Sequence, residues 1–401
     1  MGKESKLHLA VVLGFLAALA PLSIDMYLPA FPVMTEEFNA GTSAIQMTLT
    51  MTMVGMAIGQ LFAGPISDRW GRKNPLALGM TFFTLSTFGC IFSENITFFL
   101  VCRFIQGLSG SFGIVVARAI ARDIYKGAEL TKFISLLMLV NGIAPILAPV
   151  IGGQILVFTH WRGIFVMLAV VGVLLILSSL SLTETLSEEF RMKDVFSSFK
   201  MFGTLLHDKY FLGHCLIQFT IFASFFAYIS GSPFLFQNIY HVSPQMYSFI
   251  FGGLGACMVL SGLIPMRLAG RVADIKLMAW AVGQALVGSI LFMICVSFNV
   301  SIVFTTLSLL IFVTTIPVFG AASFSLSMRY HAKEAGTASA IFGFSSMFSG
   351  GLVAPLVGIG GSNDALPMAI MLFLGTFATL IIFIKMIYSI HHHGYVIIHR
   401  F

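Results

Sequence analysis

Long apolar segments are the feature of this chain that most limits the folds open to it. A hydrocarbon core about 30 Å thick requires about 20 consecutive apolar residues for each spanning helix. Such segments follow one another along nearly the whole sequence. Hydrophobic residues make up 58% of the 401 residues and charged residues only 9%, whereas about 25% of a soluble domain is charged. The sequence therefore predicts a polytopic membrane protein that leaves no room for a soluble domain.

Twelve spans are predicted from the lengths of these segments. They lie near residues 8–32, 44–65, 76–93, 97–120, 132–157, 162–182, 210–234, 247–267, 276–297, 300–321, 336–358 and 366–388. One long polar interval, 184–209, follows the sixth span and is interpreted as a cytoplasmic linker. The predicted fold is an all-α membrane protein with six-helix bundles at 1–183 and 210–390 and a cytoplasmic tail at 391–401.

The positions of the Lys and Arg residues predict how the spans are oriented. Cytoplasmic loops carry an excess of these residues, and a cytoplasmic N-terminus places all but three of the 22 on the inside. Arg162 falls outside, and Arg103 and Arg118 lie within the fourth span. Both termini are therefore predicted to be cytoplasmic. The net charge of +6 does not indicate a nucleic-acid partner, because the basic residues are scattered among short loops.

The two halves share short patterns at equivalent places in their spans. The matching pairs are Ala148–Gly152 with Ala354–Gly358, Gly71-Arg72 with Gly270-Arg271, and Pro29 with Pro233. The members of each pair are separated by similar lengths of chain. A parallel six-plus-six repeat is the architecture expected of a transporter whose halves rock around a central site.

Several other classes of protein are disfavoured by the sequence. Ala18–Ala20 resembles a signal-peptide cleavage site, but the apolar run continues to Pro32, which predicts an uncleaved first helix. The five cysteines lie in apolar segments at wide spacing and are interpreted as small buried residues rather than disulfides or metal ligands. The tail His391–His393 is weak support for a metal site, and none is predicted. No nucleotide-binding loop of the G-x-x-x-x-G-K-[ST] form occurs, so ATP is not the expected energy source.

Asp25 and Arg103 are charged residues within predicted membrane spans, where charged side chains are rare. An acid in the hydrocarbon costs about 2.5–3.5 kcal/mol on insertion scales, so Asp25 is expected to face the bundle interior and to have a role. Helical rise places Asp25 and Arg103 at similar depths in the outer half of the membrane. We interpret them as a proton-coupling pair, in which burial favours the neutral acid and Arg103 favours the carboxylate. A static ion pair and an Asp25 hydrated near the outer interface are the alternatives.

The loop Gly64–Lys73 has the pattern G-x-x-x-D-R-x-G-R-K between two spans. This pattern closely resembles the signature between the second and third helices of major facilitator superfamily transporters. A basic cytoplasmic loop of another origin is the alternative. We expect a cytoplasmic gate that joins the ends of the two halves and consists of Gly64, Asp68, Arg69, Gly71, Arg72, Arg118 and Asp123. Substrate binding is the alternative for Arg118.

Two further segments resemble motifs of the same superfamily. The segment Arg103–Gly110 resembles its fourth-helix motif R-x-x-Q-G, which is associated with proton transfer, and Gln106 lies on the same helical face as Arg103. The fifth span resembles the helix-five motif of drug/proton antiporters, with Ala148 in place of the expected glycine. Its matching residues are Pro145, Pro149, Gly152 and Gly153. Asn141 in this span is a candidate for substrate contact or, equally, for an interhelical hydrogen bond.

The spans of the second half contain no acid, Lys or Arg in their cores. His214 is expected to lie at the interface near the inner end of the seventh span. Aromatic residues crowd that span, at Phe219, Phe222, Phe225, Phe226 and Tyr228. Such a lining suits lipophilic substrates, although packing against lipid or neighbouring helices also explains any one of these residues. Phe222 and Tyr228, with Gln106 and Asn141 of the first half, are the predicted substrate-cavity residues.

Over essentially its whole length the chain resembles the Bcr/CflA subfamily of drug/proton antiporters, most specifically in Pro21–Pro32. The resemblance implies proton-coupled efflux of lipophilic drugs of the bicyclomycin or phenicol type, by a monomer in a bacterial inner membrane. Its partners would be a small lipophilic substrate, protons and the lipid bilayer, without a cofactor. An exporter of a physiological metabolite or siderophore is the first alternative. A membrane-embedded enzyme is disfavoured, because no His/Asp or Ser/His cluster is found at a membrane face.

Overall fold

The computed structural model of the protein describes residues 3–191, 203, 205–268, 270–331 and 335–389. Within these residues the chain forms helices and no strand. The helices are α1 Lys3–Asp25, η1 Leu28–Ala30, α2 Phe31–Glu37, α3 Thr42–Trp70, α4 Lys73–Ile91, α5 Ile96–Ile124, α6 Gly127–Phe158, α7 Arg162–Ser181, η2 Glu188–Phe190, α9 Lys209–Phe234, η3 Leu235–Ile239, α10 Pro244–Ser261, α11 Leu263–Leu268, α12 Asp274–Ser297, α13 Ile302–Val313, α14 Thr315–His331, α15 Ala335–Val357, η5 Gly358–Gly360, α16 Leu366–Ile382 and η6 Phe383–Tyr388.

Twelve helical segments of the described chain are long and apolar enough to cross a membrane, which confirms the predicted all-α fold with twelve spans. The first, His8–Glu37, is longer than the predicted 8–32, because α2 continues the path of α1 beyond a short irregular stretch. The predicted cytoplasmic location of both termini stays a prediction. The tail at 391–401 lies outside the described residues.

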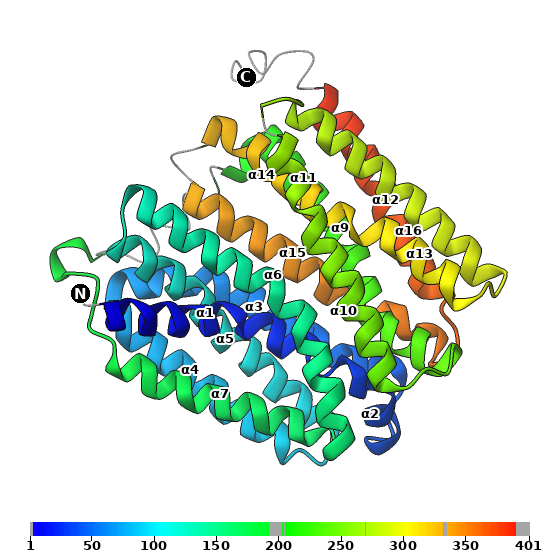
Figure 1. The fold of residues 1–401 in the computed structure, drawn as a ribbon, viewed down its shortest axis with the longest axis horizontal. Helices are drawn as coiled ribbons and strands as arrows, with labels where there is room; N and C mark the ends of the chain where they lie inside the picture. Colours follow the sequence, from blue (N-terminus) through cyan, green and yellow to red (C-terminus); the bar gives the residue numbers. More distant parts are fainter. Residues whose placement is uncertain (1–2, 192–202, 204, 269, 332–334, 390–401) are drawn as a thin grey trace. The chain divides into compact units, whose positions relative to one another are not determined.

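The residues group into two compact units. Unit 1 comprises 1–198 and 241–252, and unit 2 comprises 199–240 and 253–401. In Figure 1, α1 to α7 of unit 1 run from blue to green, and α12 to α16 of unit 2 from yellow-green to red. The predicted domain boundaries at 183 and 210 stay predictions.

Unit 1 has a tightly packed core in which α3 and α5 approach closely. A Cβ on Gly55 would overlap the backbone of Phe104, and a Cβ on Gly107 would overlap the Thr52 carbonyl. Small residues that let two backbones approach in this way are typical of membrane helix interfaces. Gly55 and Gly107 therefore allow the close approach of α3 and α5.

Opposite ends of the helices of unit 1 carry two different polar clusters. Gly71 lies at the end of α3, near Glu184, which follows α7. Glu37 lies at the end of α2, near Arg162 at the start of α7. We call these the Gly71 end and the Glu37 end, and the predicted orientation makes the Gly71 end cytoplasmic.

The first span changes its helical geometry beside the predicted proton-coupling acid. The helix α1 ends at Asp25, a turn follows at Met26, and Pro29 lies in the short helix η1. A Cβ on Gly152 of α6 would overlap the carbonyl oxygen of Met26. The backbone at this turn is therefore covered by the backbone of α6, at a glycine that the helix-five motif contains.

Candidate functional site

Asp25 is the last residue of α1 and lies inside unit 1. Its side chain is only 5% exposed. Its Oδ1 atom has no hydrogen-bond partner among the described residues. A buried carboxyl oxygen without a partner is costly and usually has a functional explanation.

Arg103 of α5 is fully buried near the same turn. It donates to the Oε1 atom of Gln106 and, over 2.8 Å, to the carbonyl oxygen of Ser23. Its guanidinium carbon lies 4.3 Å from the centroid of the Tyr27 ring and 5.6 Å from that of Phe165. Within the described chain it makes no ion pair with Asp25. The role of the two residues in proton coupling therefore stays a prediction.

Gln106 connects Arg103 to a neighbouring helix. Its amide nitrogen donates to the hydroxyl of Thr87 on α4 over 2.7 Å, while its Oε1 atom accepts from Arg103. The side chain is fully buried. Gln106 and Arg103 therefore lie on the same helical face, as predicted, and are joined by a hydrogen bond. Contact between Gln106 and a substrate stays a prediction.

Arg72 is the centre of the polar cluster at the Gly71 end. Its Nε donates to Asp123 over 2.9 Å, and one terminal nitrogen donates to Asp68 and, over 2.9 Å, to the hydroxyl of Ser67. Burial would lower the pKa of Arg72, but the hydrogen bonds and charges of Asp123 and Asp68 outweigh it and raise the pKa. The guanidinium is therefore a fixed positive charge that joins the end of α3 to the end of α5.

Glu184 completes this cluster, although no motif in the sequence indicates it. Its carboxylate accepts from the backbone nitrogens of Arg72 and Lys73 over 2.8 and 3.2 Å. Burial would raise the pKa of Glu184, but hydrogen bonds from the backbone N–H groups of Arg72, Leu186, Lys73 and Thr185 lower it below its ordinary range. The carboxylate also fills the space beside Gly71, whose φ of +87° is in the left-handed region. The sole signal in the sequence was an acid directly after the sixth span.

The other predicted gate residues lie apart from the hydrogen bonds of this cluster. Arg118 and Arg69 are exposed, and neither has an ion pair within the described residues. Arg69 lies over the Trp70 ring at 5.8 Å. Gly64 has room for an ordinary contact with Val115. Their roles as gate residues stay predictions.

The helix-five motif lies at two backbone contacts of α6. Pro145 and Pro149 are both inside the helix. Gly152 lies against the turn after Asp25, and a Cβ on Gly153 would overlap the hydroxyl of Ser248. Asn141 is half-buried and has no hydrogen bond within the described chain. Its two interpretations therefore both remain open.

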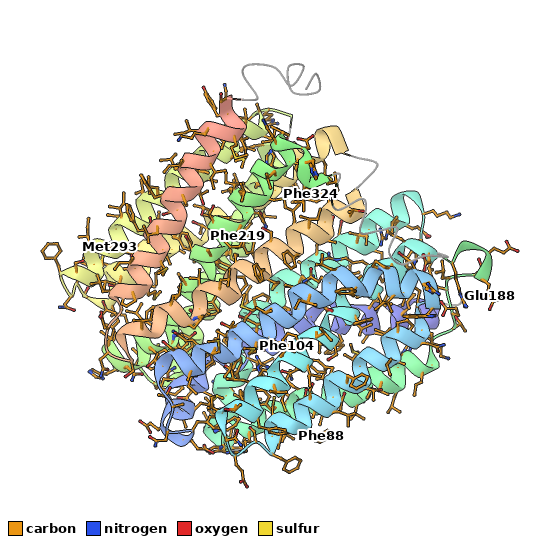
Figure 2. The ribbon with its side chains drawn as sticks, turned by 180° about the vertical axis from the view of Figure 1, so that it is seen from behind. Phe88, Phe104, Glu188, Phe219, Met293 and Phe324 are labelled. Atoms are coloured by element: carbon orange, nitrogen blue, oxygen red, sulfur yellow. The ribbon has the colours of Figure 1, made fainter. Side chains whose placement is uncertain are left out.

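The aromatic side chains of α9 form a cluster in unit 2. The Phe225 ring lies 6.0 Å from Phe222, 5.7 Å from Phe226 and 6.1 Å from Tyr228, between centroids. Phe222 is half-buried and Tyr228 is 2% exposed. Phe219 lies on the same helix (Figure 2). Substrate contact by Phe222 and Tyr228 stays a prediction.

His214 of unit 2 is fully buried against another span. Its Nδ1 lies 3.0 Å from the hydroxyl of Ser323 on α14, and its expected depth near the inner membrane interface stays a prediction. The sequence does not reveal this contact, because Ser323 lies in another span.

Comparisons with known proteins identify the family. Residues 13–355 match the Major Facilitator Superfamily, and the chain belongs to this family. It is therefore a multi-pass membrane transporter and not an enzyme, as predicted. Transporters of this family generally need no cofactor. Among the described residues, no group of three or more His, Cys, Asp or Glu could hold a metal ion, and the His391–His393 tail lies outside them.

Three related proteins cover most or nearly two thirds of the chain, and the one with the highest identity of the three is named as uncharacterized. The chain is 40% identical over 376 residues to the uncharacterized MFS-type transporter YdgK of Bacillus subtilis (strain 168), covering 93% of each chain. It is 27% identical over 368 residues to a bicyclomycin resistance protein homolog of Haemophilus influenzae, covering 91% of this chain and 92% of that one. It is 32% identical over 255 residues to the multidrug resistance protein MdtL of Escherichia coli O157:H7, covering 63% and 64%.

Solved structures of other transporters share the fold. A bacterial homolog of the human lysosomal transporter Spinster aligns with a TM-score of 0.74 and 14% identity, over 97% of this chain and 96% of that one. A D-xylose–proton symporter aligns with a TM-score of 0.71 and 14% identity, over 93% and 97%. At this identity the likeness concerns the fold alone.

Proposed function

We propose that this protein exports lipophilic drugs from a bacterial cytoplasm in exchange for protons, as a monomer in the inner membrane. The observation that carries the proposal is Asp25, a buried acid with an unpartnered oxygen beside the buried Arg103. An ionisable group kept inside a membrane bundle at this cost is typical of a proton or ion pathway. The bicyclomycin and multidrug resistance relatives support the substrate class.

In the proposed cycle, a drug binds the form in which Asp25 has released its proton to the cytoplasm. A proton that enters from outside neutralises Asp25 and favours release of the drug outward. Proton entry and drug export are coupled because protonation of Asp25 stabilises the outward-facing conformation relative to the inward-facing one. The polar cluster around Arg72 would hold the Gly71 end in one of those conformations.

Transport by the purified full-length protein in proteoliposomes tests the proposal. Vesicles with an acidic lumen are expected to accumulate ethidium and chloramphenicol, and Asp25→Asn is expected to reduce accumulation to that of protein-free vesicles. Glu36→Gln is the matched control, because Glu36 is an exposed acid on the continuation of the same span. Full gradient-driven accumulation by Asp25→Asn would refute the role of Asp25. Wild-type vesicles that accumulate neither probe, but release a physiological metabolite, would refute the substrate class.

A further inference from the structure

The guanidinium of Arg103 lies against two aromatic rings instead of a carboxylate. Tyr27 comes from the turn after α1, and Phe165 comes from α7. Both ring centroids lie within the distance of about 6 Å at which a cation is attracted to a ring face. Because Arg103 is fully buried, this attraction is little weakened by solvent. We call Tyr27 and Phe165 the aromatic cage.

Contacts that do not involve Arg103 hold the cage in place. The Tyr27 hydroxyl lies 2.8 Å from the hydroxyl of Thr48 on α3. The two cage rings contact each other edge to face at 5.6 Å, and Phe165 contacts Trp161 in the same way at 5.8 Å. The Trp161 nitrogen in turn donates to Glu37 over 2.6 Å. Both rings are therefore held by contacts that do not depend on the guanidinium.

Asp25 makes no ion pair with Arg103 among the described residues. Its buried Oδ1 has no partner, while Arg103 donates to a backbone carbonyl two residues earlier in the chain. An ionised carboxylate left buried and unpaired is strongly disfavoured. The arrangement thus fits a neutral Asp25 carboxyl group and an Arg103 that is stabilised by other means.

We propose that Tyr27 and Phe165 are positioning residues for proton coupling, and this inference rests on the proposed function. The cage holds the Arg103 guanidinium while Asp25 carries its proton. When the carboxyl group gives that proton to water, the resulting carboxylate attracts the guanidinium out of the cage. Arg103 keeps its charge throughout, and one proton is released for each carboxylate formed.

No second acid competes for Arg103 among the described groups around it. Cys90 on α4 contacts Cys102 on α5 and lies near the guanidinium. The helix α7 contributes the apolar Phe165, and Asp25 and Tyr27 come from the first span. In the proposed exchange, Asp25 is therefore the acid that competes with the cage and with the Gln106 and Ser23 oxygens for the guanidinium.

Infrared spectroscopy of the full-length protein tests the cage without a drug. The carbonyl stretch of a protonated carboxyl group, identified by its loss in Asp25→Asn, reports the neutral form of Asp25. Tyr27→Leu and Phe165→Leu are expected to reduce its amplitude at neutral pH by about threefold or more, because the guanidinium loses the cation–π alternative. Tyr27→Phe keeps the ring and is expected to retain the band. Phe292→Leu is the matched control, because Phe292 is a fully buried ring of α12 in unit 2.

Fluorinated phenylalanines at position 165 provide a second test that keeps the packing of the side chain. Each added fluorine weakens the attraction of the ring for a cation, so the band is expected to fall stepwise. An unchanged band in the leucine and fluorinated variants overturns the cage. A wild type without an Asp25-dependent band overturns it as well. These results are separable from a failure of the proposed function, which shows as absent accumulation of ethidium and chloramphenicol despite a normal band.

Discussion

Replacing Glu184 by alanine is expected to destabilise unit 1 at the Gly71 end. The first residue before α4, Arg72, offers no side-chain cap to the helix that follows it. The Glu184 carboxylate supplies that cap from a distant part of the chain, through the nitrogens of Arg72 and Lys73. Glu184→Ala leaves those two donors without this partner and removes a negative charge from a helix N-terminus.

The size of the effect follows from these two losses. A missing N-terminal cap costs about 1 kcal/mol, and a lost charge at a helix N-terminus costs about 0.3–1 kcal/mol. Together they amount to about 1–2 kcal/mol. For a cooperative unit of about 200 residues, this lowers the midpoint of thermal unfolding by roughly 2–8 °C.

Thermal unfolding in detergent, followed with a thiol-reactive dye, measures this change, because four of the five cysteines are buried in the folded protein. Glu184→Gln keeps an acceptor oxygen and loses the charge, so an intermediate midpoint is expected. Glu188→Ala is the control, since Glu188 is an exposed acid a few residues away (Figure 2) with an ion pair of 3.5 Å to Arg191. It is expected to change stability by less than about 0.5 kcal/mol.

The pH dependence separates the charge from the side chain itself. The pKa of Glu184 is lowered in the folded protein, so its contribution is complete above the ordinary carboxyl pKa of about 4.3 and is lost as the pH falls through the lowered value. The difference between wild type and Glu184→Ala is therefore expected to be constant from pH 6 to pH 8 and to shrink below about pH 4. An equal effect of Glu188→Ala, or a difference that does not shrink in acid, would refute the reasoning.

Three further substitutions are expected to change stability, two at glycines that lie close to other groups and one at a side chain that joins two helices. Gly71→Ala should lower the unfolding midpoint at least twice as far as Gly270→Ala, because both glycines have positive φ but only Gly71 lies against another group, Glu184; equal shifts would contradict this. Gly152→Ala should cost about 1–3 kcal/mol and reduce transport, whereas Gly14→Ala in the same pair of helices, with 3.8 Å to Val140, should be tolerated. Gln284→Leu should cost about 1 kcal/mol in unfolding assays, because it removes two interhelical hydrogen bonds, to the Ile311 carbonyl and the Thr314 hydroxyl; a stability equal to wild type would contradict it.

The sequence predicted the spans because each depends on a local property of the chain. Apolar length alone located twelve helices, and the helical period alone placed Gln106 beside Arg103. The loop pattern likewise located Asp68 and Arg72, which are four residues apart and bonded. Span positions and contacts within one helix or one loop could therefore be predicted from the sequence alone.

Contacts between distant segments were not accessible in this way. Depth along the membrane normal placed Asp25 and Arg103 at the same level, but rotation of α5 about its axis decides that Arg103 meets Tyr27 and Phe165. The same limit applies to Glu184, which bonds a loop more than a hundred residues earlier. Tertiary packing sets these rotations, and hydropathy carries no information about them.

The two units differ in how their polar groups are paired. Unit 2 joins its helices through neutral pairs, such as Thr220 with Thr379 and Ser289 with Thr376, each at 2.8 Å. Interhelical hydrogen bonds of this kind contribute about 0.6 kcal/mol each on average in a membrane, so the loss of one is mild. Unit 1 instead keeps Asp25 and Arg103 buried, at an insertion cost of about 2.5–3.5 kcal/mol for each such residue. Packing alone does not require that cost, since unit 2 folds without it. We therefore expect the charges of unit 1 to be retained for transport rather than for stability.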